Sequence, residues 1–131
     1  CSMETKKTGY AQKKFGMPTK RYCQMLDLYN DPQLIKDYMD CHSPEKAWPE
    51  ISAGIREVGI LEMEIYIVDN HLFMIVDTPL DFDWDESFGK LASLERQAEW
   101  EDYVAKFQIV KPGSASAEKW TLMERMFKLL D

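Results

Sequence analysis

Residues 60–78, ILEMEIYIVDNHLFMIVDT, are the stretch on which the predicted fold rests. In its first half the apolar positions 61, 63, 65 and 67 alternate with Glu62, Glu64 and Tyr66, which is the period of a strand with one apolar face. Asn70 is a favoured tight-turn residue, so 60–68 and 72–78 are predicted to form a hairpin. Helices should cover the apolar side, and His71 is then an exposed turn residue without a chemical role.

The segment before the hairpin predicts a strand over 20–29 and a broken helix over 32–58. Asp31 is a good N-cap and Pro32 a good first helical residue, while Gly59 is placed to end the helix. Pro44 cannot continue a helix from within, so the helix is expected to restart at Ser43-Pro44. Leu34, Tyr38 and His42 recur at i, i+4 and i+8, which puts them on one inward face.

The segment after the hairpin predicts two more helices and a closing strand. Asp83 or Asp85 caps a short helix, and Ser93 is expected to cap a second one that runs to Phe107. Residues 111–119 have the composition of a loop, and the alternation from Trp120 onward favours a final strand. The order is that of a ferredoxin-like βαββαβ fold of the α+β class, with residues 1–18 as a flexible arm and 19–131 as one domain.

Composition excludes several classes of function. The net charge is −7 and the chain has no strong basic cluster, which argues against nucleic acid or an anionic membrane surface as a partner. No apolar run approaches the roughly 20 residues that span a bilayer. The three cysteines form no C-x-x-C or zinc pattern, which indicates reduced thiols and a cytoplasmic protein with no bound metal. The acidic residues at 81–86 are better explained by helix capping than by calcium binding.

Proton transfer is the chemistry that the remaining residues favour. Signatures of dinucleotide binding, phosphate loops, zinc proteases and serine hydrolases are absent from the sequence. General acid–base catalysis needs only a placed histidine with a hydrogen-bonding partner, and Tyr38 lies one helical turn before His42. The alternative is that both side chains are core residues that merely satisfy their hydrogen bonds.

The motif around these residues resembles a known family. Tyr38, His42, Pro44, Trp48, Pro49 and Glu50 follow the pattern Y-x-x-x-H-x-P-x-x-x-W-P-E, which is similar to the signature of the L-rhamnose mutarotase family. The resemblance extends over residues 20–131. It implies an enzyme that interconverts the α and β anomers of a 6-deoxy sugar without a cofactor. It also implies a homodimer whose sheets pack together into an α+β barrel.

The resemblance assigns roles to individual residues. His42 matches the family's proton donor, and Tyr38 matches a tyrosine that contacts the sugar. Trp100 matches the second of two adjacent tryptophans that contact the sugar, whereas Glu99 replaces the first. Met63 falls where the family has another sugar-contacting tyrosine.

These departures bear on the substrate. Glu99 and Met63 lie where selectivity would be set, so they make L-fucose a candidate substrate beside L-rhamnose. Trp48 or Trp100 offers an apolar face to the sugar's methyl group. The competing hypothesis is a dimeric ferredoxin-like binding module without turnover. A third hypothesis is a cofactorless monooxygenase, which requires a large pocket for aromatic substrates.

Overall fold

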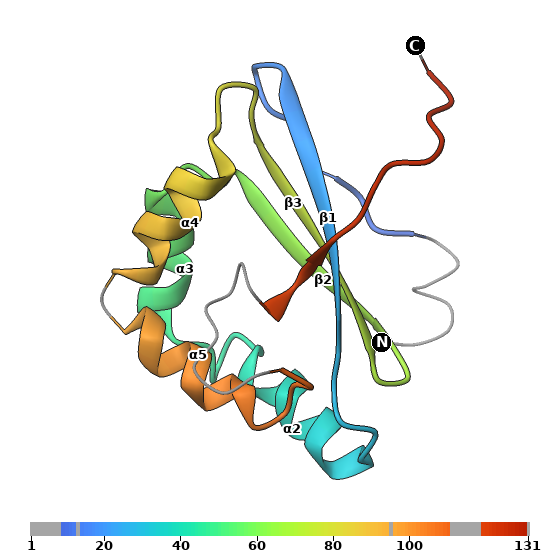
Figure 1. The fold of residues 1–131 in the computed structure, drawn as a ribbon, viewed down its shortest axis with the longest axis vertical. Helices are drawn as coiled ribbons and strands as arrows, with labels where there is room; N and C mark the ends of the chain where they lie inside the picture. Colours follow the sequence, from blue (N-terminus) through green and yellow to red (C-terminus); the bar gives the residue numbers. More distant parts are fainter. Residues whose placement is uncertain (1–8, 13, 95, 111–118, 131) are drawn as a thin grey trace.

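The computed structural model describes residues 9–12, 14–94, 96–110 and 119–130. Its centre is an antiparallel sheet with the strand order β2-β3-β1-β4 (Figure 1). The strands are β1 (Thr19–Asp27), β2 (Glu62–Val68), β3 (His71–Pro79) and β4 (Thr121–Leu122). This order confirms the predicted ferredoxin-like α+β class, in which the first strand lies between the third and the last.

The hairpin forms as its sequence predicts. Met63 pairs with Val76 and Ile65 with Met74, so the apolar side chains of both strands share one face. Asp69 adopts φ 53° in the turn between the strands. His71 is exposed, and its Nδ1 lies 2.8 Å from Asp27 Oδ1, which makes it a surface partner of β1.

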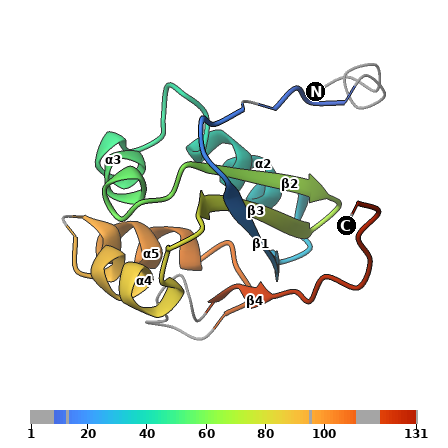
Figure 2. The ribbon, with the colours of Figure 1, turned by 90° about the horizontal axis from the view of Figure 1, so that it is seen from above.

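All the described helices lie on one side of the sheet, as Figures 1 and 2 show. They are α2 (Pro32–Cys41), α3 (Pro49–Glu57), α4 (Trp84–Ala92) and α5 (Gln97–Ala105). The core between sheet and helices contains Leu26, Leu28, Leu72, Met74, Val76, Tyr38, Ile51, Phe88, Leu91 and Val104. At the end of α3, Gly59 has φ +102°, a conformation that favours glycine and confirms its predicted position at the helix end.

The second half of the first helical segment begins later than predicted. Asp31 caps α2 by accepting hydrogen bonds from the backbone of residues 33 and 34. After α2 the chain makes a single turn, in which the N–H groups of residues 46 and 47 donate to the Ser43 carbonyl. Trp48 then adopts φ −80° and ψ 118°, the extended conformation that a following proline favours, and α3 starts at Pro49. The expected restart at Ser43-Pro44 was wrong because Pro49 forces this extended residue.

The second helical pair also begins differently from the prediction. Asp83 caps α4, since its carboxylate accepts from the N–H of Glu86, which confirms helix capping as the role of this acidic residue. Ser93 is the C-cap of α4 and not the N-cap of α5, because its hydroxyl donates to the Lys90 carbonyl at 2.7 Å. The N-cap of α5 is instead Arg96, with φ 64°.

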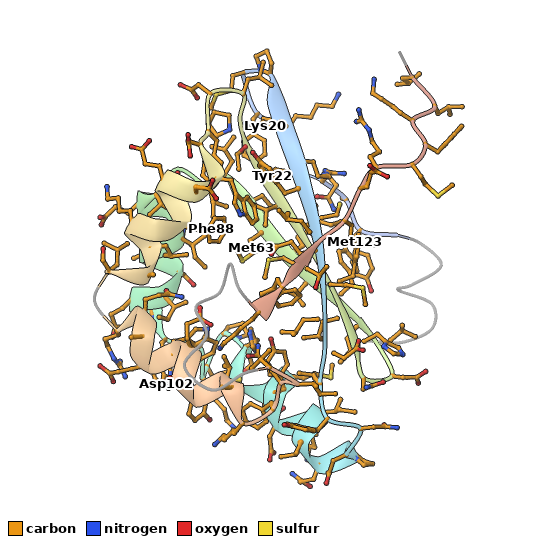
Figure 3. The ribbon with its side chains drawn as sticks, in the orientation of Figure 1. Lys20, Tyr22, Met63, Phe88, Asp102 and Met123 are labelled. Atoms are coloured by element: carbon orange, nitrogen blue, oxygen red, sulfur yellow. The ribbon has the colours of Figure 1, made fainter. Side chains whose placement is uncertain are left out.

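The final strand is much shorter than the alternation suggested. Only residues 121 and 122 pair with β1, and Met123 adds one backbone hydrogen bond to Cys23. Residues 123–130 are exposed and leave the sheet, with Met123 marking the departure in Figure 3. In this register residues 124–127 would lie opposite residues 22–19 of β1, but they do not pair with them, so alternation alone did not extend the strand. The predicted loop at 111–119 lies outside the described residues except for Lys119.

Residues 10 and 12 contact the outer face of the sheet. The described residues before β1 contain no helix or strand. Tyr10 packs edge-on against Tyr66 at 5.6 Å, and the Gln12 amide donates to Glu64 at 3.4 Å. Part of the arm therefore contacts the polar side of β2. Among the described residues, no helix has both the length and the apolar character needed to cross a lipid bilayer.

Candidate active site

A cavity of about 450 Å³ lies between the sheet and the helices, within the usual range for small-molecule sites. Its wall combines residues from α2, α3, α5 and β2 with Trp120. Five of the six site residues predicted from the sequence line it: Tyr38, His42, Trp48, Met63 and Trp100. Met63 is labelled in Figure 3, on β2. In the part of the chain that the structure describes, no group of three His, Cys, Asp or Glu residues is arranged to hold a metal ion.

Glu99 is the predicted site residue that the structure does not bring to this cavity. Its side chain is 65% exposed and lies 3.7 Å from Arg96. On α5 the residues that line the cavity are Gln97, Trp100, Glu101 and Val104, which share one face of the helix. Glu99 lies on another face. The acidic residue of α5 that does line the cavity is Glu101, and Glu62 of β2 lines it as well.

His42 is held by the last turn of α2. Its backbone N–H donates to carbonyls of that turn, so the residue is the C-cap of the helix. Its Nδ1 lies 2.8 Å from the Tyr38 carbonyl oxygen. A carbonyl can only accept, so Nδ1 carries the hydrogen and Nε2 keeps its lone pair. The prediction that His42 points inward holds only in part, because the residue is exposed at the cavity wall and not enclosed in the core.

The surroundings of His42 favour its neutral form. Its ring centroid lies 4.5 Å from that of Tyr38 and 5.2 Å from that of Trp100. Partial desolvation among these rings lowers the pKa of His42 from its ordinary value, and the hydrogen bond to the Tyr38 carbonyl offsets part of that effect. At neutral pH the imidazole is therefore uncharged, with Nε2 available as a base.

Tyr38 stays protonated under the same conditions. The residue is 4% exposed, and its hydroxyl receives a long hydrogen bond of 3.4 Å from the Gln108 amide. Burial raises the pKa of Tyr38 far above its ordinary value, and the contact with Gln108 counteracts only part of the rise. The phenol is thus a hydrogen-bond donor and not a base.

Two tryptophans form the apolar side of the cavity. The rings of Trp48 and Trp100 meet edge-on at 5.2 Å. Arg96 stacks its guanidinium over Trp48 at 4.1 Å and donates to Glu50 at 2.8 Å. Its hydrogen bond lowers the pKa of the Glu50 carboxyl. Glu50, the last residue of the motif, therefore acts through Arg96 to hold Trp48 in place.

Sequence reasoning missed a polar part of the wall. Gln97, Glu101 and Gln108 line the cavity, and Lys119 lies directly behind Glu101. The spacing of Gln97 and Glu101 around Trp100 on one helix carried a usable signal. Gln108 and Lys119 carried none, because their positions depend on how the chain continues after α5.

The fold and the site together define a ferredoxin-like domain with an aromatic cavity whose wall includes a histidine that is neutral at neutral pH. A profile of the family described as L-rhamnose mutarotase matches residues 21–129. An L-fucose mutarotase from Xanthomonas campestris pv. campestris is 36% identical over 113 residues, which cover 86% of this chain and 90% of that protein. An L-rhamnose mutarotase from Burkholderia cenocepacia is 30% identical over 63% of this chain and 75% of its own length.

A solved structure supports the fold. The crystal structure of L-rhamnose mutarotase FA22100 from Formosa agariphila matches with a TM-score of 0.63 at 23% identity, over 85% of this chain and 99% of that one. The chain belongs to the L-rhamnose mutarotase family, as its motif predicted, and is a sugar mutarotase.

Proposed function

We propose that the protein interconverts the α and β anomers of L-fucose, and also accepts L-rhamnose, by proton transfer through His42 without a cofactor. The observation that carries the proposal is that His42 lines the aromatic cavity while its Nδ1 contacts the Tyr38 carbonyl, which leaves Nε2 as the nitrogen that can act as a base. The similarity to an L-fucose mutarotase, which is higher and covers more of the chain than the similarity to the rhamnose enzyme, supports L-fucose as the substrate.

The reaction needs one proton to move between two oxygens on the same carbon. Nε2 of His42 takes the proton of the O1 hydroxyl, and the electron pair left on O1 forms the C1=O1 bond of the aldehyde. The C1–O5 bond breaks, and O5 takes its electron pair and the proton from the imidazolium. After rotation about C1–C2, the same steps run in reverse on the other face of the aldehyde. General acid–base help of this kind contributes about 10²–10⁴-fold.

Tyr38 and the tryptophans hold the sugar for this step. The protonated phenol donates a hydrogen bond to a sugar oxygen, since its raised pKa keeps the proton on the ring. Trp48 and Trp100 present apolar surface to the C–H face and the methyl group of a 6-deoxy sugar. Met63 completes the apolar floor from β2.

Anomer exchange measured by NMR tests the proposal. Saturation transfer between the α and β signals of L-fucose and of L-rhamnose is recorded with and without protein. Exchange faster than the blank for both sugars, and fastest for L-fucose, is the expected result. Binding of either sugar without faster exchange would favour the binding module, and a preference for L-rhamnose by a wide margin would overturn the substrate assignment.

The proposal also includes a homodimer of the chain. Residues 126, 127, 129 and 130 are apolar and 93%, 70%, 83% and 76% exposed, respectively, which is unusual for a chain that works alone. They follow the edge strand β4 and run away from the helices (Figure 2). We expect a homodimer that buries this segment and the outer face of the sheet. Light scattering at micromolar concentration should give about twice the chain mass of 15.4 kDa, and a mass of one chain would contradict it.

A further inference from the structure

Glu101 and Lys119 form an ion pair in the wall of the cavity. Lys119 Nζ lies 2.9 Å from Glu101 Oε1 and 2.6 Å from the backbone carbonyl of the same residue. The Lys119 side chain is fully buried and that of Glu101 is 12% exposed. Lys119 does not line the cavity, whereas Glu101 does. The lysine thus lies behind the carboxylate and the carboxylate faces the ligand space.

The stability of the fold does not by itself explain why a buried ion pair stands at this position. Taking two charges out of water costs several kcal/mol per ion, and apolar residues of similar volume are often as stable. What the pair does provide is a fixed carboxylate. Lys119 bonds one carboxylate oxygen, and the Gln97 amide donates to the other at 2.6 Å. A carboxylate has about four acceptor positions, so about two remain for a ligand.

Gln108 adds an independent sign that a polar ligand belongs here. The residue is 2% exposed, and its Nε2 donates to the Tyr38 hydroxyl. Its Oε1 has no hydrogen-bond partner among the described residues. Exchanging the amide oxygen and nitrogen would only leave the nitrogen unpaired instead. Buried polar atoms are rarely left unpaired, and Gln108 lines the cavity, so a ligand hydroxyl would satisfy this enclosed oxygen once the side chain turns it toward the cavity.

We infer that Glu101 is a sugar-binding residue, whose carboxylate accepts hydrogen bonds from substrate hydroxyls and thereby selects among stereoisomers. Lys119 and Gln97 are positioning residues that hold it. The inference rests on the proposed sugar substrate and extends it, because it names the wall that reads the hydroxyls. A buried acceptor rejects a ligand that lacks the matching hydroxyl much more strongly than an apolar surface does.

The test uses a variant that removes the pair without leaving a lone buried charge. The double change Glu101→Gln with Lys119→Met does this, and circular dichroism and melting establish that it folds. Asp102→Asn is the matched control, since Asp102 is exposed on the same helix and points away from the sheet (Figure 3). Should the double variant fail to fold, Glu101→Asp keeps the charge beside Lys119, withdraws the carboxylate by one methylene and is measured in the same way.

The ligands are L-fucose and its 2-deoxy, 3-deoxy and 4-deoxy analogues. Dissociation constants from NMR titration and anomer exchange rates are measured for each. Wild type should lose about 10- to 100-fold in affinity for the analogue that lacks the hydroxyl bound by Glu101, as expected for a bond to a charged group. The variant should bind that analogue and L-fucose equally well, and Asp102→Asn should behave as wild type.

The inference would be overturned if the double variant lost the same factor in affinity for all four sugars, or lost none. The ion pair would then be only a structural link between α5 and the residues before β4. Turnover does not decide this outcome, because the affinities are read separately. Wild type that binds the sugars without faster exchange refutes His42 catalysis and still tests Glu101. Wild type that binds none of them refutes both.

Discussion

Replacing His42 separates its chemical role from its structural one. Alanine removes the whole imidazole. Asparagine places an amide nitrogen near the position of Nδ1, where it can still donate to the Tyr38 carbonyl, but it has no counterpart of Nε2. The proposed mechanism needs Nε2, so both variants should lose about 10²–10⁴-fold in catalysed exchange, equivalent to about 2.7–5.4 kcal/mol.

The structural cost of the same change is small. The hydrogen bond from Nδ1 to the Tyr38 carbonyl is 2.8 Å long, but the same carbonyl is also 3.0 Å from the Cys41 thiol, and His42 is exposed to water. Its loss in the alanine variant should cost less than about 1 kcal/mol, or at most about 4 °C in Tm. Asparagine should recover most of that stability and none of the activity.

The measurement is saturation transfer on L-fucose with the uncatalysed rate subtracted, beside thermal melting of each variant. L-Fucose titration confirms that the cavity still binds. Exchange by the asparagine variant within threefold of wild type would refute the role of Nε2. Activity that rises and falls with Tm across the two variants would show that His42 is only structural.

Three further predictions follow from the site. The catalysed rate should rise with pH through the pKa of His42, which is lowered below the ordinary value of about 6.5, and stay level above it because the neutral imidazole is the base; a profile that falls across this range would contradict the assignment. Arg96→Ala should raise KM for L-fucose several-fold with little change in kcat, because Trp48 loses the cation stacked at 4.1 Å; steady-state kinetics with unchanged KM would show that Trp48 is held by other contacts. Met63→Tyr adds a hydroxyl to the cavity and should shift the ratio of exchange rates toward L-rhamnose by about 2- to 10-fold; an unchanged ratio in a folded variant would remove Met63 from the residues that set selectivity.

The parts of the fold that could be predicted are those that depend on residues close together in the sequence. The hairpin follows from alternation and a turn residue, and the starts of α2 and α4 follow from the caps Asp31 and Asp83. Two errors in the helix boundaries arose where two local signals compete. Pro44 and Pro49 both qualify as the first residue of a helix, and the extended conformation of Trp48 decides for Pro49. Ser93 suits either end of a helix, and its hydroxyl bond to Lys90 shows that it ends one.

The site shows the same difference between residues that are close in the sequence, which could be predicted, and residues that only the fold brings together. Tyr38 and His42 are one helical turn apart, so the proposed base and its neighbouring phenol are recognisable from four residues of spacing. Glu101, Gln108 and Lys119 meet only because α5 and the chain before β4 converge on one wall, and no local pattern records that convergence. The proposed base and the inferred hydroxyl-binding residue therefore lie on different elements, with His42 at the end of α2 and Glu101 on α5. On this proposal, substitutions around Glu101 change the preferred sugar while proton transfer at His42 stays intact, which agrees with the similarity of this chain to both an L-fucose and an L-rhamnose mutarotase.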